Sequence, residues 1–248
     1  MSVAALPCPT PAEGDTTCRW EGYNNQGAVT VSAPGVAPVR ILTDRQSEYA
    51  RIAVVRFDRR VPRPGVIVES QRGGSGGILT VQLLAPTRSG YRVLALSGVG
   101  GGSLQGELAD GPTDLSGDGV TDLVLADGRF DSVFGCNAYT PRPPAVFAVK
   151  GGALVDESAD PALARVFAAD MALRRTACAS GKPGRNGSCA AYVADAARAG
   201  RFGAAWADML RHYDRAAPER WPARPGQPAR SFPASLRAFL RTMGYLPR

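Results

Sequence analysis

The hydrophobic pattern of this chain changes its period near residue 156, and this change constrains the fold more than any other feature. Before residue 156, short β-branched and aromatic runs are separated by glycine and proline, which is typical of strands. These runs cover residues 28–32, 39–42, 52–57, 66–70, 78–84, 91–96, 120–125 and 145–149. Several of them alternate apolar with polar residues, as strands do when one face meets water.

After residue 156 the apolar residues recur at helical spacing. Asp160 is placed to cap a helix that begins with Pro161 and turns Leu163, Val166, Phe167, Met171 and Leu173 inward. Ser188 is the expected cap of a second helix, which ends near Gly200. Two further helices have the apolar faces Trp206, Met209, Leu210, Tyr213 and Leu236, Phe239, Leu240, Met243.

The predicted fold class is therefore α+β, with a mostly antiparallel β-sheet or small sandwich followed by a C-terminal helical subdomain. We expect three parts: an N-terminal segment over residues 1–19, a β-rich domain over residues 20–155 and an α-helical subdomain over residues 156–248.

Acidic residues alternate with small ones between residues 114 and 122, a spacing that suits a calcium ion. Such an ion takes several oxygen ligands, and a central glycine permits the sharp turn that brings them together. The expected ligands are Asp114, Ser116, Asp118, the carbonyl of Val120, and Asp122. An EF-hand is excluded because Leu125 stands where that loop needs a bidentate glutamate. The alternative is an ordinary turn, which Asp and Gly also favour without a metal.

This loop resembles the calcium loops of FG-GAP and VCBS repeats. It occurs once, and the strand-rich part is too short for the four or more blades of a closed propeller, so a complete propeller is not expected. A wider resemblance, to uncharacterised exported bacterial proteins with one such loop, rests on motifs in a fixed order. These are Glu69–Gly74, Asp118-Gly119, Asp127–Phe130, Phe134, Pro143-Pro144, Gly152–Asp156 and Phe232–Leu236. The resemblance implies a fold and a location, and no activity.

Five cysteines indicate the compartment. Cys8 with Cys18 and Cys178 with Cys189 are separated by short loop-forming stretches, so two local disulfides are expected, and Cys136 is left as a buried thiol. A zinc cluster is disfavoured because no C-x-x-C pair exists. Disulfides and a calcium loop indicate an oxidising space, periplasmic or secreted. The first seven residues do not form a signal peptide, so we expect an export signal that is absent from this sequence.

Composition excludes several classes of protein. With 44% hydrophobic and 21% charged residues the chain is an ordinary globular one, and no apolar run approaches the ~20 residues of a transmembrane helix. The net charge is +7, but the cations are scattered and only two, Lys150 and Lys182, are lysines. Nucleic-acid binding is therefore not expected.

Catalytic patterns are weak. Gly73–Gly77 formally matches G-x-S-x-G around Ser75, with His212 downstream, but a nucleophile elbow lies between a strand and a helix, and a strand follows here. A Cys136–His212 dyad lacks a recognisable activating environment. Phe130, Phe134, Tyr139 and the Pro141–Pro144 segment either form an exposed groove for a peptide or glycan or cover a sheet edge.

Two hypotheses about the function follow from these sequence features. The preferred one is a non-catalytic calcium-binding module of the bacterial envelope, with an unknown protein or glycan as its partner. The rival is an envelope hydrolase that uses Ser75 or a carboxylate beside the metal.

Overall fold

The computed structural model describes residues 2–6, 26–43, 47–72, 78–95, 104–105, 111–135, 140–182, 184–217 and 231–247. The chain forms two compact units. The first contains residues 1–125 and 147–155, and the second contains residues 126–146 and 156–248. Residues 126–146 thus group with the helices although they precede residue 156.

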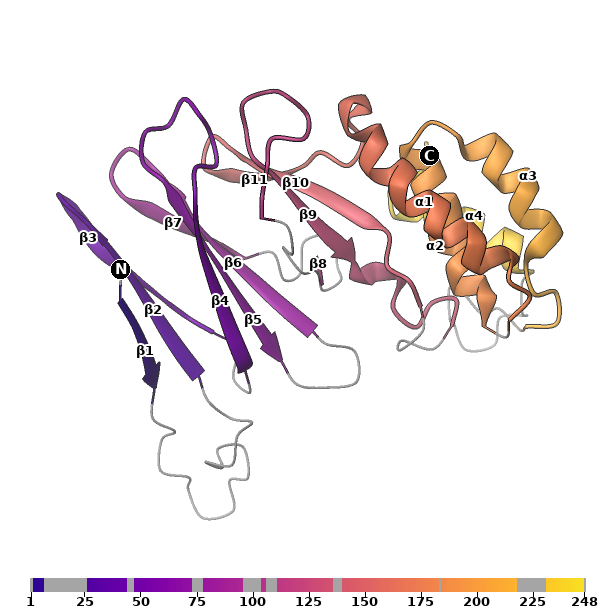
Figure 1. Cartoon of the computed structure of the whole chain (residues 1–248), viewed down its shortest axis with the longest axis horizontal. Coiled ribbons are helices and arrows are strands. Elements are labelled where there is room, and N and C mark those ends of the chain that lie inside the picture. Colours follow the sequence, from indigo (N-terminus) through magenta and orange to yellow (C-terminus); the bar gives the residue numbers. More distant parts are fainter. Residues whose placement is uncertain are drawn as a thin grey trace, which may run out of the picture. The chain divides into compact units, whose positions relative to one another are not determined.

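The first unit contains two antiparallel sheets (Figure 1). The smaller has the order β1 (Ser2–Leu6), β2 (Gln26–Ala33), β3 (Val36–Leu42). The larger has the order β4 (Ser47–Val55), β5 (Gly65–Arg72), β6 (Ile78–Pro86), β7 (Tyr91–Ala95). A third sheet has the order β11 (Ala153–Asp156), β10 (Pro144–Lys150), β9 (Asp122–Asp127), β8 (Leu104–Gln105).

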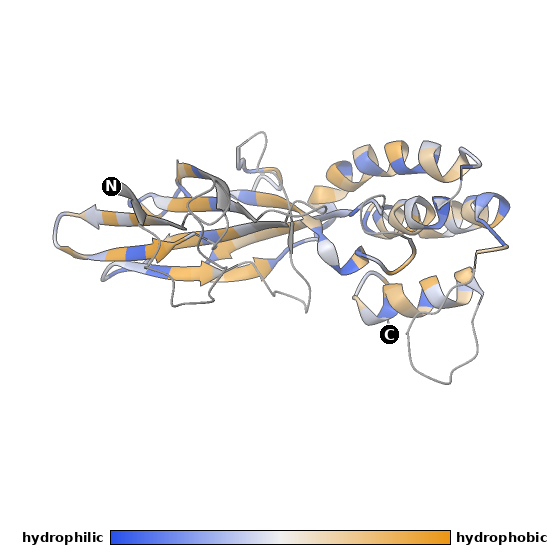
Figure 2. Ribbon diagram, turned by 90° about the horizontal axis from the view of Figure 1, so that it is seen from below, coloured by the Kyte–Doolittle hydropathy of each residue, from blue (hydrophilic) through white to orange (hydrophobic). Residues whose placement is uncertain are grey.

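One hydrophobic cluster joins the first two sheets. It contains Val29 and Val31 of β2, Ile41 of β3, Val66 and Val68 of β5, and Leu84 of β6. Side chains on alternate positions of a strand point to the same face, so both sheets turn one face toward this shared core. Hydrophobic and hydrophilic residues accordingly alternate along the strands (Figure 2). The predicted small sandwich is confirmed, and the described strands form neither a closed barrel nor a propeller.

Gly65, at the start of β5, is fixed by close packing. A Cβ atom placed there would lie 2.2 Å from the ring of Phe57 and 2.7 Å from the carbonyl oxygen of Leu84. Phe57 itself is buried, with 2% of its surface exposed. The segment that carries Phe57 therefore lies directly on the sheet at a position where only glycine leaves room.

The second unit contains the helices. They are the 3-10 turns η2 (Gly128–Phe130) and η4 (Pro161–Leu163), and the helices α1 (Ala164–Ala179), α2 (Arg185–Arg198), α3 (Phe202–His212) and α4 (Phe232–Thr242). Asp160 caps the first turn as predicted, since its side chain accepts a hydrogen bond from the Ala162 amide at 2.8 Å. None of the helices in the described part of the chain is long and apolar enough to span a membrane.

Two helical expectations are wrong. The second helix begins at Arg185, after Gly184 in a left-handed conformation (φ 75°), and not after Ser188. Asn186 explains the earlier start, because its side chain donates to the carbonyl of Asp214 and accepts from the Asp214 amide. Leu173, expected to point inward, is 61% exposed, because its position in α1 lies away from the face that buries Phe167.

The core of the second unit is aromatic. Phe130 and Phe134 are 0% and 2% exposed, and their rings lie 4.9 and 5.3 Å from the ring of Phe239 in α4. Edge-to-face pairs at such distances are favourable arrangements of aromatic rings. The prediction that these two phenylalanines form an exposed groove is therefore wrong, because they are buried against α4. Tyr139, the third residue of that set, lies outside the described residues.

Cys178 at the end of α1 and Cys189 in α2 form the predicted disulfide bond. Cys8, Cys18 and Cys136 lie outside the described residues, so the other cysteine predictions stay predictions.

Candidate functional site

The 114–122 loop folds around its own carboxylates. Asp114 accepts hydrogen bonds from the amides of Gly117 and Gly119, at 2.7 and 3.1 Å. Both glycines have positive φ, 83° and 87°, a conformation that other residues adopt only with strain. The glycines thus turn the backbone so that its amides face a carboxylate.

The later carboxylates close the loop. Asp118 accepts from the amide of Val120 at 2.8 Å, and Oδ2 of Asp122 accepts from the amides of Leu115 and Ser116 at 2.7 and 2.8 Å. Asp122 is 1% exposed and also bridges to Thr113 across the loop. These positions are the ones the sequence predicted as ligands, and the fold brings them into one loop.

The loop also holds the segment between β4 and β5. Val120 forms a β-bridge with Asp58, the Arg59 amide donates to the Gly119 carbonyl at 3.0 Å, and the Thr121 amide donates to the Phe57 carbonyl at 2.8 Å. The Thr121 hydroxyl adds a bond to the carbonyl of Arg56 at 2.8 Å. The backbone of residues 56–59 is therefore fixed by the loop.

Two basic side chains from outside the loop pair with its carboxylates. Lys150 of β10 lies 2.7 Å from Oδ2 of Asp118, and this contact lowers the pKa of Asp118. The guanidinium of Arg59 lies 3.3 Å from Oδ2 of Asp114, although its side chain is 75% exposed. Neither cation is recognisable from the sequence, because both come from segments distant in the chain from the loop.

Two oxygens of the loop are buried without a hydrogen-bond partner: Oδ1 of Asp122 and Oγ of Ser116. The Ser116 hydroxyl lies close enough to Asp118 to help lower its pKa, but not in hydrogen-bonding geometry. Within the described residues no three acidic, His or Cys side chains are grouped so that they could hold a metal ion. The residues fit a hard cation in one respect, since both unpartnered oxygens occupy expected ligand positions.

The hydrolase residues are not brought together by any described contact. Ser75 lies outside the described residues, in the segment that joins the antiparallel strands β5 and β6, so a strand and not a helix follows it. His212, at the end of α3, lies 3.6 Å from Asp208, which also pairs with Arg175 and Arg211. This is the environment of a helix-surface ion pair.

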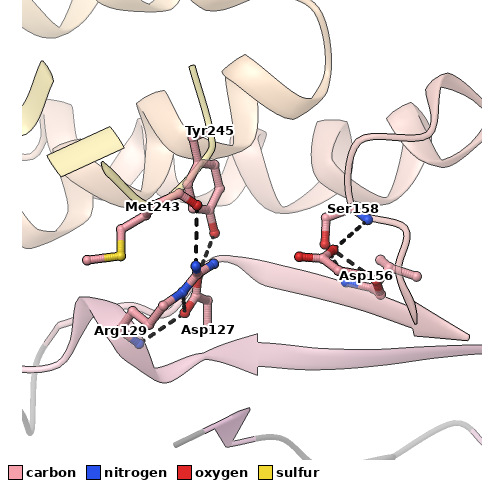
Figure 3. A network of polar contacts seen from close by, with 7 residues as sticks. Asp127, Arg129, Asp156, Ser158, Met243 and Tyr245 are labelled. Carbon is pink, nitrogen blue, oxygen red and sulfur yellow. Dashed lines mark hydrogen bonds and ion pairs between the residues drawn. The ribbon is translucent and has the colours of Figure 1, made fainter. Parts of the chain in front are cut away.

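A buried polar network that the sequence does not reveal lies around Asp127 (Figure 3). Asp127, at the end of β9, is fully buried and pairs with Arg129. The hydroxyl of Tyr245 donates to Asp127 at 2.8 Å, and Arg129 donates to the carbonyl of Met243 at 3.3 Å. Burial, followed by the nearby charge of Asp127, raises the pKa of Tyr245 well above its ordinary value, so this phenol stays protonated. The network anchors the segment after α4 within the second unit.

Asp195 of α2 is the most perturbed carboxyl group. Burial is the main cause that raises its pKa to about 10, followed by the nearby charge of Asp170 in α1. Among the described residues, neither carboxyl oxygen of Asp195 has a hydrogen-bond partner, whereas Asp170 pairs with Arg174 at 2.9 Å. Protonation of Asp195 explains why a carboxyl group is tolerated between two helices.

Comparison with known proteins gives limited similarity. Residues 165–244 match the family model described as the sll0997 C-terminal domain. The probable thylakoid lumen protein sll0997 of Synechocystis sp. is 29% identical over 171 residues, which are 67% of this chain and 49% of that protein. The uncharacterized protein y4bJ of Sinorhizobium fredii is 25% identical over 213 residues, 79% of this chain and 32% of that protein. No solved structure matches.

The chain thus spans about half of the length of the relative from Synechocystis sp. and about a third of the length of the relative from Sinorhizobium fredii. One relative is named only by its probable location and the other is uncharacterized, in agreement with the resemblance to proteins without an assigned activity. The matched family model covers the helical region and not the 114–122 loop, so it gives no support to the resemblance to VCBS or FG-GAP repeats.

Proposed function

We propose that this chain is an exported, non-catalytic binding module whose 114–122 loop binds calcium and so fixes the neighbouring 56–59 segment. The observation that carries the calcium proposal is Oδ1 of Asp122, which is buried without a partner. An unpaired buried oxygen costs about 1–3 kcal/mol, and a cation would remove that cost.

The residues that would hold the ion are Asp114, Ser116, Asp118, Val120 through its carbonyl, and Asp122. All supply oxygen, which is the ligand that Ca²⁺ prefers. In this proposal Asp118 and Asp114 exchange the cations of Lys150 and Arg59 for the ion. The proposed loop therefore has two states in which two positive charges face its three carboxylates, one closed by Arg59 and Lys150 and one closed by calcium.

Two observations support export. The Cys178–Cys189 disulfide is of a kind that persists in oxidising compartments. The relative from Synechocystis sp. is named a probable thylakoid lumen protein. We propose a periplasmic or secreted location on these grounds.

The test is a thermal melt of the full chain at increasing calcium, with magnesium as the comparison ion. A ligand that binds only the folded state at a hundred times its Kd stabilises it by about 2.7 kcal/mol, so Tm should rise with calcium. Asp118→Asn and Asp122→Asn should abolish that rise. Asp131→Asn makes the same charge change outside the loop and should retain it.

Lys150→Gln provides the sharper test. Because its ammonium group lies 2.7 Å from Asp118, its removal should strengthen calcium binding if ion and ammonium compete. A Tm that does not move at millimolar calcium, in either the natural chain or this variant, would refute the calcium proposal.

The hydrolase alternative gains no supporting contact among the described residues. Treatment with a fluorophosphonate probe would settle it, because labelling of Ser75 would show an activated serine and would contradict the non-catalytic proposal.

A further inference from the structure

A cavity of about 1190 Å³ lies at one end of the first unit. Four connections gather around it: the β2–β3 turn, the segment between β4 and β5, the β6–β7 turn and the β10–β11 turn. The segment between β4 and β5 is also the one whose backbone is bonded to the 114–122 loop. Sites for small ligands usually enclose about 300–1,000 Å³, so this cavity has room for more than a single ion.

The charges that line the cavity are mostly positive. Four arginines contribute, Arg60, Arg63, Arg88 and Arg92, whereas Asp58 is the one acidic residue that lines it among those described. Asp58 does not neutralise the other three arginines, because Arg60 binds both of its carboxylate oxygens, at 2.8 and 3.0 Å. Three guanidinium groups therefore remain without a carboxylate in the described wall.

Two of these three arginines are positioned by neutral backbone groups. Arg63 donates to the carbonyls of Thr87 and Gly90, at 3.3 and 3.4 Å. Arg92 donates to the carbonyl of Gly152 at 3.5 Å. Carbonyl oxygens orient a guanidinium group without cancelling its charge, and the remaining N–H donors stay available. Arg88 has no partner within the described part of the chain, so its whole fork is available to a ligand.

Tyr91 gives the cavity a rigid wall. Its hydroxyl donates to the carbonyl of Pro64 at 3.1 Å, and Arg63 lies over its ring at 5.9 Å from the centroid. The β6–β7 turn that carries Arg88 is closed by a hydrogen bond from the Thr87 amide to the Gly90 carbonyl at 2.8 Å. Such preorganisation reduces the entropy lost when a ligand binds.

We propose that this cavity binds a multivalent oxyanion, a ligand that carries two or more carboxylate or phosphate groups, through Arg63, Arg88 and Arg92. Planar guanidinium forks bind both kinds of group in a bidentate manner. Several cations around one cavity favour a ligand with several anionic groups over a single small ion. This inference deepens the proposed binding role, on which it rests, but it does not depend on calcium.

The test is calorimetric titration of the full chain with two probes, one for each source of the anionic groups. Tripolyphosphate supplies phosphates and hexagalacturonate supplies carboxylates, while neutral maltohexaose is the uncharged control. We expect saturable binding of at least one anionic probe, no binding of maltohexaose, and weakening as salt increases. The probe that binds more tightly identifies the source.

Arg88→Gln should weaken the binding of that probe about tenfold, because it removes a charge-assisted contact. Arg40→Gln, on the exposed side of β3, makes the same charge change in the same unit away from the cavity and should leave affinity unchanged. An unchanged melting temperature shows that either variant still folds.

Two results would overturn the inference: no binding of either anionic probe, or equal weakening of binding by Arg40→Gln. Anion titrations in calcium-free buffer and calcium melts without an anionic probe separate this inference from the proposed function, because the anionic probes themselves bind calcium. Anion binding without a calcium response would refute only the calcium proposal, and a calcium response without anion binding would refute only the oxyanion site.

Discussion

Replacement of Asp195 by asparagine is expected to stabilise the protein at neutral pH. Asp195 is buried between α1 and α2, and its pKa is raised from 3.8 to about 10 by burial and by the charge of Asp170. At pH 7 the folded state keeps a proton that the unfolded chain releases. Asparagine has the same shape and stays neutral in both the folded and the unfolded chain.

The expected gain in the free energy of unfolding follows from the difference between the pKa of Asp195 in the folded and in the unfolded chain. Between pH 3.8 and about 10 the unfolded chain binds one proton fewer at this site than the folded one, so stability falls as pH rises. At about 1.4 kcal/mol per pH unit, the interval from the ordinary pKa to pH 7 corresponds to about 4 kcal/mol. Asp195→Asn should therefore gain up to about 4 kcal/mol at pH 7, and close to nothing near pH 4.

The assay is urea unfolding followed by circular dichroism at pH 5, 7 and 9. The free energy of unfolding of the variant should exceed that of the natural chain by an amount that grows with pH. Asp214→Asn, at a partly exposed carboxyl group in the same unit, is the control and should leave the pH dependence unchanged. Parallel pH profiles for the natural chain and Asp195→Asn would refute the reasoning, since they would show that Asp195 is ionised when folded.

Two further predictions concern stability. Cys178→Ala with Cys189→Ala opens a short disulfide loop and should lower the free energy of unfolding by about 2–3 kcal/mol, and a reducing agent should bring the natural chain to the same value in urea unfolding. Equal stability of the reduced and oxidised chains would contradict this. Gly65→Ala places a methyl group 2.2 Å from the Phe57 ring and 2.7 Å from the Leu84 carbonyl, and should destabilise the fold by about 1–3 kcal/mol. Phe57→Leu in the same chain should restore only part of that loss, because the carbonyl contact remains, and full restoration would show that the ring alone clashes.

Much of the fold could be predicted from local pattern. Strand β5 illustrates why: the run of β-branched residues at 66–68 lies between a proline-glycine pair and a glycine-rich stretch, so both its type and its limits are visible. Asp160 before Pro161 marks the first helical turn in the same local way. These signals depend only on neighbouring residues.

The start of α2 could not be predicted in this way. Ser188 is a good cap by itself, but the side chain of Asn186 is held by the backbone of Asp214 from beyond α3. Tertiary contacts thus begin the helix four residues earlier than the local signal suggests, with Gly184 and not Ser188 at the cap position.

The candidate site could be predicted only in part, because the sequence shows ligands that are close in the chain but not partners that are distant in it. The spacing of Asp114, Asp118 and Asp122 in the sequence located the acidic loop, but not the cations that approach it from Arg59 and Lys150. The arginines of the cavity come from separate turns that only the folded sandwich gathers. A linear sequence in which arginines are scattered conceals such a cluster.

The contact between Tyr245 and Asp127 has a consequence for the order of folding. These residues are 118 positions apart. Phe130 likewise becomes buried only when Phe239 of α4 packs against it. During synthesis, α1 and α2 can pair as soon as they emerge, but the aromatic core stays open until α4 follows. Loop closure over such a separation is slow compared with local helix pairing. A fragment limited to the helices would lack Phe130 and Phe134 and would expose the apolar face of α4, so dissection of this protein should keep residues 126–146 with the helices.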